Sequence, residues 1–400
     1  MYNIEWIVAY VAVAKLYLEV IYTDTEIYLD NGATTKVSQA AAKKVMQLLT
    51  EKYGNPSSLH SKGLEAQREV DRARSIIADK LDVTPQEIIF TSGGTESNNL
   101  AIIGAAESRK RIGNRIVVFA AEHSSVLYSC KYLESQGFDV QYIPADKNGV
   151  VNTTELENAV NEKTILVSLM LVNNETGAIQ PVDKIERIIN RKKAPAVYHC
   201  DAVQAFGKIP FTLAKLKADI ITISAHKIHA PKGVGAVCLK KGVRISQRQF
   251  GGDQEKKLRA GTEPTPLIAA FGEAVAEFDY TAIEKIKQIN LSLRQKLSKI
   301  DCIWFNSNED CLPYVLNFSV VGIRSETMLH YLAAKGIYVS SGSACAKGLS
   351  SHVLKSMSLQ KERIDSAIRV SFSKHSTLQE VQALALAIQS GIDTLVRADS

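Results

Sequence analysis

The segment ISAHKIHAPKGVG (223–235) places an amine where a buried strand meets a glycine-bearing loop. An isoleucine-rich apolar run ends at Ile223, and Lys227 follows four residues later, before Pro231 and two glycines. Burial lowers the pKa of a lysine, and the neutral amine is a nucleophile toward carbonyl groups. The position of Lys227 therefore predicts an amine that bonds an aldehyde.

Two further features match the other parts of such an aldehyde. Asp201 ends another buried run, and a buried carboxylate needs a cationic or donor partner, for which a protonated pyridine nitrogen would serve. The loop TSGGTESNN (91–99) supplies two glycines before a helical stretch, and N–H groups at a helix start bind phosphate. The loop matches neither dinucleotide nor Walker-type nucleotide motifs. An aldehyde with a ring nitrogen and a phosphate describes pyridoxal 5′-phosphate.

Taken singly, each of these features has an ordinary structural explanation. The sequence of the loop 91–99 is also typical of an ordinary strand-to-helix turn, Asp201 could be structural, and Lys227 could be a surface lysine. Their combination with His123, which follows a third apolar run, favours the cofactor site.

The elements that must position these residues alternate between two periodicities. Between Gln86 and Leu239, short apolar runs alternate with longer segments of helical period. The runs are 87–90, 115–120, 164–172, 196–200, 219–224 and 234–239. This alternation predicts an α/β fold with a mostly parallel sheet that helices cover on both faces.

Polar groups follow five of these runs. They are the loop 91–99, His123, the segment NNETG (173–177), Asp201 with Gln204, and Lys227. Ligands of open α/β sheets bind at the carboxyl ends of the strands, so we expect these groups to converge at one edge.

The pattern changes after about residue 280. A long amphipathic segment, 283–300, precedes shorter predicted strands at 314–320, 336–341 and 367–373. Thr377 and Glu380 form a capping box that begins a last helix through Val396. We expect a large cofactor-binding domain (36–280) and a smaller α+β domain (1–35 and 281–400), joined by a helix near 271–300.

Composition excludes several classes of protein. The 400 residues carry a net charge of +6 without a dense Lys/Arg block, so nothing supports nucleic-acid binding. The six cysteines form no C-x-x-C pair, which argues against a zinc site and a disulfide framework and favours a cytoplasmic protein with reduced thiols. In residues 1–25, the longest uncharged run (6–14) is too short for a membrane helix, and no secretory signal is evident. We expect either an extra packed element there or translation from an upstream start codon.

From about residue 28 to its C-terminus, the chain resembles the cysteine desulfurases of the NifS/IscS type, which are fold-type I pyridoxal-phosphate enzymes of the class V aminotransferase family. The motifs that carry the resemblance are YLDNGATT (28–35), YGNPSSLH (53–60), TSGGTESNN (91–99), AEHSSV (121–126), VNNETGAIQPV (172–182), CDAVQAFGK (200–208), SAHKIHAPKGVG (224–235), GGDQEKKLRAGTEP (251–264), SSGSACAKG (340–348) and IRVSFS (368–373). Two departures stand out. Residues 1–25 precede the usual start, and the loop after Cys345 is shorter than in the best-known housekeeping members.

The resemblance implies a cofactor-binding role for ten residues. Lys227 would bond the aldehyde, Asp201 would pair with the ring nitrogen, Gln204 would hydrogen-bond the ring hydroxyl, and His123 would stack on the ring and move protons. Asn174 is another cofactor contact. The phosphate would be held by Gly94, Thr95, Ser224 and His226, with Thr262 reaching in from the partner subunit of a homodimer.

The resemblance also implies how the substrate is bound. Asn174 and Arg369 would bind the carboxylate of L-cysteine, with Arg369 as a two-pronged donor. Cys345 would be the nucleophile. The cysteine lies in SSGSACAKGLSS (340–351), a composition typical of a mobile loop. Lone cysteines are otherwise small buried hydrophobes, which is what we expect of the other five.

The activity implied is conversion of L-cysteine to L-alanine, with the sulfur passing to Cys345 as a persulfide and then to an acceptor protein. An iron–sulfur scaffold, a tRNA-thiolating enzyme and a carrier of sulfur for cofactors all stay open as acceptors. The alternatives are a related aminotransferase, a selenocysteine lyase, or an idle scaffold that keeps the fold. Intact Lys227, Asp201, His123, Cys345 and Arg369 argue against the scaffold.

Overall fold

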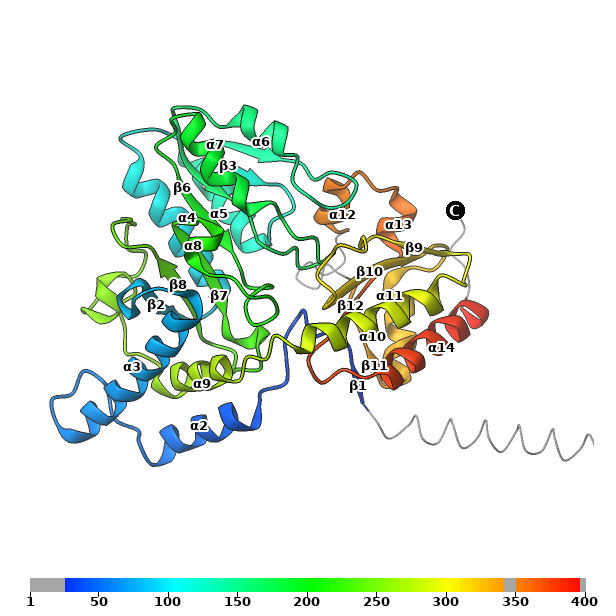
Figure 1. Cartoon of the computed structure of the whole chain (residues 1–400), viewed down its shortest axis with the longest axis horizontal. Coiled ribbons are helices and arrows are strands. Elements are labelled where there is room, and N and C mark those ends of the chain that lie inside the picture. The colour runs from blue at the N-terminus through cyan, green and yellow to red at the C-terminus, as the bar shows by residue number, and fades with distance from the viewer. Residues whose placement is uncertain (1–25, 342–349, 396–400) are drawn as a thin grey trace, which may run out of the picture.

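A seven-stranded sheet forms the centre of the larger part of the molecule (Figure 1). The computed structural model describes residues 26–341 and 350–395, so Cys345 and residues 1–25 lie outside the described part of the chain. The strands are β2 (Ile88–Thr91), β3 (Arg115–Phe119), β4 (Asp139–Ile143), β5 (Thr164–Ser168), β6 (Val197–Asp201), β7 (Ile220–Ser224) and β8 (Gly235–Leu239). Their order is β2-β8-β7-β6-β5-β3-β4, and only β8 runs antiparallel to its neighbours.

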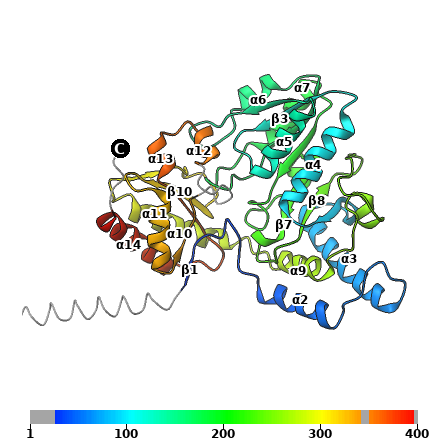
Figure 2. The ribbon, with the colours of Figure 1, turned by 180° about the vertical axis from the view of Figure 1, so that it is seen from behind.

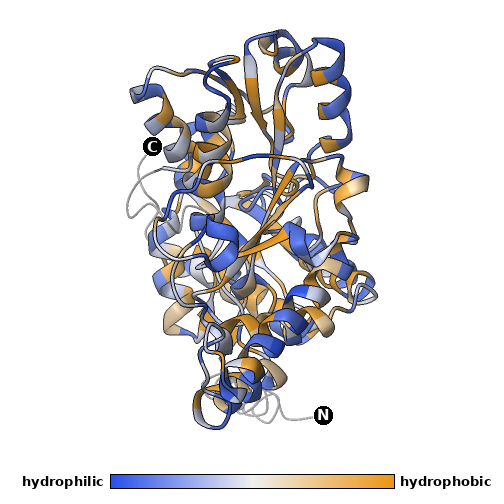
Figure 3. Ribbon diagram, turned by 90° about the vertical axis from the view of Figure 1, so that its left-hand side faces the viewer, coloured by the Kyte–Doolittle hydropathy of each residue, from blue (hydrophilic) through white to orange (hydrophobic). Residues whose placement is uncertain are grey.

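Both faces of this sheet are buried. Ile116 and Val118 of β3 belong to one apolar cluster, whereas Val117 and Phe119 belong to another, as the alternation of side chains along a strand requires. Hydrophobic strands run through the interior between helices with more polar surfaces (Figure 3). The predicted α/β sheet is confirmed.

The helices around this sheet vary widely in length. They are α2 (Gln39–Thr50), α3 (Ser61–Leu81), α4 (Gly94–Arg109), α5 (Ser124–Ser135), α6 (Thr153–Ala159), α7 (Ile185–Arg191), α8 (Leu213–Leu216) and α9 (Thr265–Ala276).

A second group of elements lies beside the first (Figure 2). The antiparallel sheet β12-β10-β9 consists of β9 (Ile303–Phe305), β10 (Val315–Val320) and β12 (Ala367–Ser371), and β1 (Ile27–Tyr28) pairs in parallel with β11 (Ile337–Tyr338). The helices are α10 (Ala282–Leu297), α11 (Ser325–Ala334), α12 (His352–Ser356), α13 (Lys361–Asp365) and α14 (Leu378–Thr394).

Several element boundaries differ from those expected. The single helix expected near 271–300 is two helices, α9 and α10, because residues 277–281 leave the helical path. There the Phe278 ring packs against Phe206, with centroids 4.9 Å apart. The apolar run 164–172 is a strand only to Ser168, and the strand expected at 336–341 is the two-residue β11. Strand β4 was not predicted.

The start of the last helix was predicted correctly. The Thr377 hydroxyl accepts from the Glu380 N–H, and the Glu380 carboxylate accepts from the Thr377 N–H, which completes the capping box. The division of the chain into domains at residues 35/36 and 280/281 stays a prediction; the second boundary falls in the break between α9 and α10.

Candidate active site

Lys227 lies in a short turn that two strands hold in place. The turn Ala225–Lys227 follows β7 directly, and β8 returns antiparallel along β7. The Lys227 Nζ donates to the carbonyl oxygens of Gly32 and Ala33, at 2.6 Å each. The amine therefore faces the segment between β1 and α2, which precedes it by almost half the chain.

Asp201 ends β6 and is 5% exposed. Its Oδ1 accepts from the Val203 N–H at 2.9 Å, and its Oδ2 accepts from Asn98 Nδ2 at 2.8 Å. Asn98 lies near the start of α4 and also donates to the Ser125 hydroxyl at 2.8 Å. The carboxylate is thus fixed from two sides by donors, and Asn98 is a site residue that the sequence did not single out.

His123 caps the N-terminus of α5. Its Nδ1 lies 2.8 Å from the Ser125 hydroxyl and accepts from the Ser125 N–H at 3.2 Å. Burial lowers the pKa of His123, the charge of Lys227 lowers it further, and the Asp201 carboxylate opposes both. His123 is therefore a neutral imidazole that interacts with both charged groups.

The N-terminus of α4 lies against β7. Gly93, just before the helix, has φ +150°, a conformation that favours glycine. A Cβ placed on Gly94 would lie 3.5 Å from the Ser224 Cβ, so the two residues are adjacent. The Ser224 hydroxyl is buried and has no hydrogen-bond partner among the described residues. Helix N–H groups and an unused hydroxyl together suit a phosphate.

The other predicted phosphate ligands differ in their surroundings. Thr95 is exposed on the first turn of α4. The Nδ1 of His226 lies 3.3 Å from the Thr34 hydroxyl, and burial lowers the pKa of His226 to about 4. Thr262 is exposed before α9, and no hydrogen bond of the described residues links it to this group.

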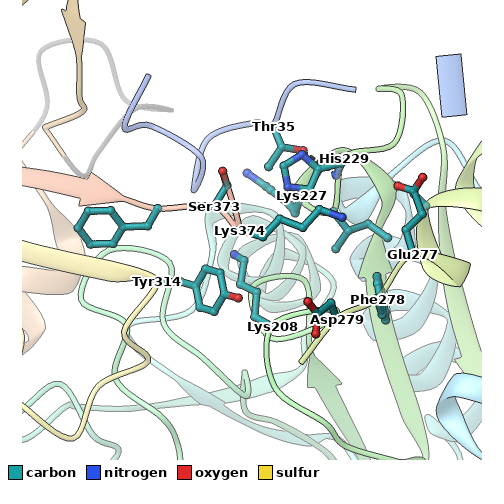
Figure 4. A pocket seen from close by; sticks show the side chains of 14 residues that line it. Thr35, Lys208, Lys227, His229, Glu277, Phe278, Asp279, Tyr314, Ser373 and Lys374 are labelled. Atoms are coloured by element: carbon teal, nitrogen blue, oxygen red, sulfur yellow. Dashed lines mark hydrogen bonds between the residues drawn. The ribbon is translucent and has the colours of Figure 1, made fainter. Parts of the chain in front are cut away.

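Gln204 contacts the same carbonyl as Lys227. Its Nε2 donates to the Gly32 oxygen at 3.0 Å, and its Oε1 accepts from Lys208 Nζ at 2.9 Å. Lys208 and Lys227 also line a pocket beside the break between α9 and α10, together with Asp279 and Tyr314 (Figure 4).

Arg369 on β12 brings the second sheet to this edge. It is 2% exposed, and its Nη1 donates to the Asn174 carbonyl at 3.0 Å. Its Nη2 donates to Asp30 Oδ1 at 2.7 Å. The Arg369 Nε and the Asn174 Oδ1 are buried without partners among the described residues. Because buried polar groups are rarely left unpaired, these two atoms are available to a polar ligand.

The arrangement fits pyridoxal phosphate. An amine, a carboxylate and a neutral imidazole lie together, and an unpaired hydroxyl lies beside a helix N-terminus.

In the described part of the chain, no group of three His, Cys, Asp or Glu side chains could hold a metal ion. No described helix has the length and apolarity to span a membrane.

Five cysteines can be compared with expectation. Cys130, Cys200 and Cys238 are buried, as expected, whereas Cys302 and Cys311 are partly exposed. Burial raises the pKa of the three buried thiols, so they stay protonated. Cys345 lies outside the described residues, and its role stays a prediction.

The fold and the residues at this edge of the sheet are those of the fold-type I class of enzymes, and comparison with known proteins agrees. The aminotransferase class-V family matches residues 27–384, and the chain belongs to that family. It is 40% identical over 362 residues to the cysteine desulfurase IscS of Methanosarcina thermophila, covering 89% of each chain.

Solved structures are similar as well. A NifS-like protein superposes with a TM-score of 0.88 at 38% identity, covering 93% of this chain and all of the other. The protein SspA in complex with cysteine superposes with a TM-score of 0.78 at 30% identity, covering 88% of this chain and all of the other.

Proposed function

We propose that this chain is a pyridoxal-phosphate-dependent cysteine desulfurase. The observation that carries the proposal is the meeting of Lys227, Asp201 and His123 at one sheet edge, opposite Arg369 from the second sheet. The 40% identity to an IscS over nearly the whole chain supports the same activity.

The substrate would be bound by its carboxylate. The Arg369 Nε is a buried donor without a partner among the described residues, and a guanidinium binds a carboxylate through two parallel hydrogen bonds. Asn174 would join through its side-chain NH₂ group, because an amide oxygen only accepts. This contact would fix the Cα–H bond toward Lys227. Burial of Arg369 excludes water from the contact, which strengthens it.

Pyridoxal phosphate, when bound, supplies an aldehyde that bonds amines and a ring that takes up electrons from the amino acid. Asp201 would keep a proton on the ring nitrogen, held in place by Asn98. Lys227 would move the Cα proton. Neutral His123 would take or return a proton, for which its lowered pKa suits it.

The sulfur step would belong to Cys345. Its thiolate would attack the substrate sulfur, the carbon–sulfur bond would break with its electron pair on the carbon side, and a persulfide would stay on Cys345 while alanine is released. A thiol of an acceptor protein would then take the outer sulfur. The protonated thiols of Cys130, Cys200 and Cys238 do not compete for it, because only the thiolate is nucleophilic.

One experiment tests this activity. Wild type and Cys345→Ala are given L-cysteine labelled on sulfur without reductant, and peptide mapping by mass spectrometry locates the label. We expect label on Cys345 in wild type, with one alanine per persulfide, and none in the variant. A protein that takes no label but forms a keto acid would instead be an aminotransferase.

A further inference from the structure

Lys208 is a buried amine without an obvious function. It is 6% exposed, and no carboxylate of the described residues forms an ion pair with it. Burial lowers the pKa of Lys208 to about 7, and the charges of Lys227 and Arg369 act in the same direction. Burying an uncompensated amine is costly, so its position here calls for a specific contact.

The contact of Lys208 leads to the catalytic lysine in three hydrogen bonds. Lys208 Nζ donates to Gln204 Oε1 at 2.9 Å, and Gln204 Nε2 donates to the Gly32 oxygen at 3.0 Å. Lys227 Nζ donates to the same Gly32 oxygen at 2.6 Å. Gln204 is thus held between two lysines, and its amide nitrogen lies on the side of Lys227.

This geometry decides which way the amide faces. In its ammonium form Lys208 carries only donors, so this form can face the oxygen of an amide but not its NH₂ group. The Gly32 carbonyl accepts only, so it selects the NH₂ group at the other end. Without Lys208, the Gln204 oxygen would be buried without a donor, a state that favours rotation of the amide.

We propose that Lys208 is a positioning residue that holds the Gln204 amide with its NH₂ group toward the cofactor's ring hydroxyl. This assignment rests on the proposed function. One hydrogen of the NH₂ group bonds the Gly32 oxygen, and the other is left to donate to the hydroxyl oxygen in its ionised form. A rotated amide would present an acceptor instead and would disfavour that ionised form.

Gln204 and Lys208 lie in one turn, so the hydrogen bond between them forms independently of the cofactor. The N–H groups of Phe206 and Lys208 donate to the carbonyls of Ala202 and Ala205 at 2.9 Å each, which holds the turn after β6. The ring of Phe206 packs against Phe271 and Phe278. Lys208 therefore reaches Gln204 from a rigid turn, as a positioning residue must.

A double-mutant cycle tests the proposal without measuring activity. The variants Lys208→Met, Gln204→Met and the double variant are titrated with pyridoxal phosphate, recording its dissociation constant and its visible absorption spectrum. We expect each single variant to weaken binding about tenfold and to move absorption from the yellow band toward the near ultraviolet. The double variant should add nothing further. Lys240→Met, at an exposed lysine, is the control.

Two results would overturn the proposal. One is a Lys208→Met protein with the wild-type spectrum and affinity. The other is an effect of Lys208→Met that persists in full in the Gln204→Met background. A wild-type protein that binds no pyridoxal phosphate would instead refute the proposed function, so the two failures are distinguishable.

A reciprocal measurement covers the case in which Lys208→Met does not fold. Here Lys208 is kept, and its acetylation by limiting acetic anhydride is followed by peptide mapping in wild type and Gln204→Met. Loss of the acceptor should speed acetylation of Lys208 several-fold relative to Lys240. An unchanged rate would show that Gln204 does not hold the amine, and the proposal would fail.

Discussion

Arg369 and Asp30 form an ion pair, with 2.7 Å between Nη2 and Oδ1. The pair joins β12 to the segment between β1 and α2, so two stretches of chain 339 positions apart meet at the proposed substrate end of the site. Removal of one member of a largely buried pair leaves the other charge uncompensated.

The first prediction concerns this pair. Asp30→Asn should lower the free energy of unfolding by about 1–3 kcal/mol and raise KM for cysteine, because the guanidinium loses the partner that orients it. Urea denaturation and steady-state kinetics measure the two effects. Asp139→Asn is the matched control, since Asp139 pairs with Arg115 at the same 2.7 Å but is more exposed. Equal losses in the two variants would contradict the prediction.

Asn98 provides the second prediction. Asn98→Ala removes the donor to Asp201 Oδ2 and should weaken binding of pyridoxal phosphate about tenfold. Titration followed by absorption measures the affinity. Asn99→Ala is the control, because the neighbouring amide donates only to the Thr95 carbonyl in the described structure. If both variants bind the cofactor as wild type does, Asn98 does not act through Asp201.

The third prediction identifies the lysine that bonds the cofactor. Borohydride makes such a bond permanent, and peptide mapping should then find the added mass on the peptide with Lys227. Lys227→Ala should lose this label, whereas Lys232→Ala, in the same loop, should keep it. Label on any other lysine of wild type would refute the assignment of Lys227.

The fourth prediction concerns pH. His199 is fully buried, with Nδ1 2.9 Å from the Ser168 hydroxyl and Nε2 3.0 Å from that of Thr222, and burial lowers its pKa to about 4. Its folded pKa lies below the unfolded value of about 6.5, so the unfolded chain takes up the proton first. The stability from this group is complete above about pH 6.5 and is lost as the pH falls toward 4.

Denaturation at several pH values measures this effect. His199 should account for a loss of up to about 3 kcal/mol between pH 6.5 and 4. His199→Gln should be less stable than wild type at pH 7.5 and should lose less on acidification. His60→Gln, at an exposed helix cap, should keep the wild-type slope. A His199→Gln protein with that same slope would contradict the assignment.

The sheet could be predicted because its strands are buried on both faces and read as continuous apolar runs. Strand β4 (DVQYI) was not predicted because it is an edge strand that is mostly half-buried, and its hydrophobic pattern is therefore weak. The break at 277–281 depends on the packing of Phe278 against Phe206, which a local pattern does not contain.

The residues of the candidate site also divide into those that the sequence pattern indicates and those that only the fold reveals. Lys227, Asp201 and His123 could be proposed because each lies at, or within four residues of, the carboxyl end of its strand. Asn98 and Lys208 were not singled out, because their importance lies in partners brought close by the fold, Asp201 and Gln204. In the sequence, Lys208 looks like an ordinary lysine of a surface turn.

The Lys227 amine and the carbonyl oxygen of Gly32 that it contacts are 195 positions apart in the chain. A cut in any loop between α2 and β7 would therefore leave the amine on one fragment and the carbonyls of Gly32 and Ala33 on the other. Neither fragment could complete the site alone. Two such fragments, expressed together, would regain the yellow colour of bound pyridoxal phosphate only on reassembly. The absorption of the cofactor would therefore report whether the two fragments have reassembled.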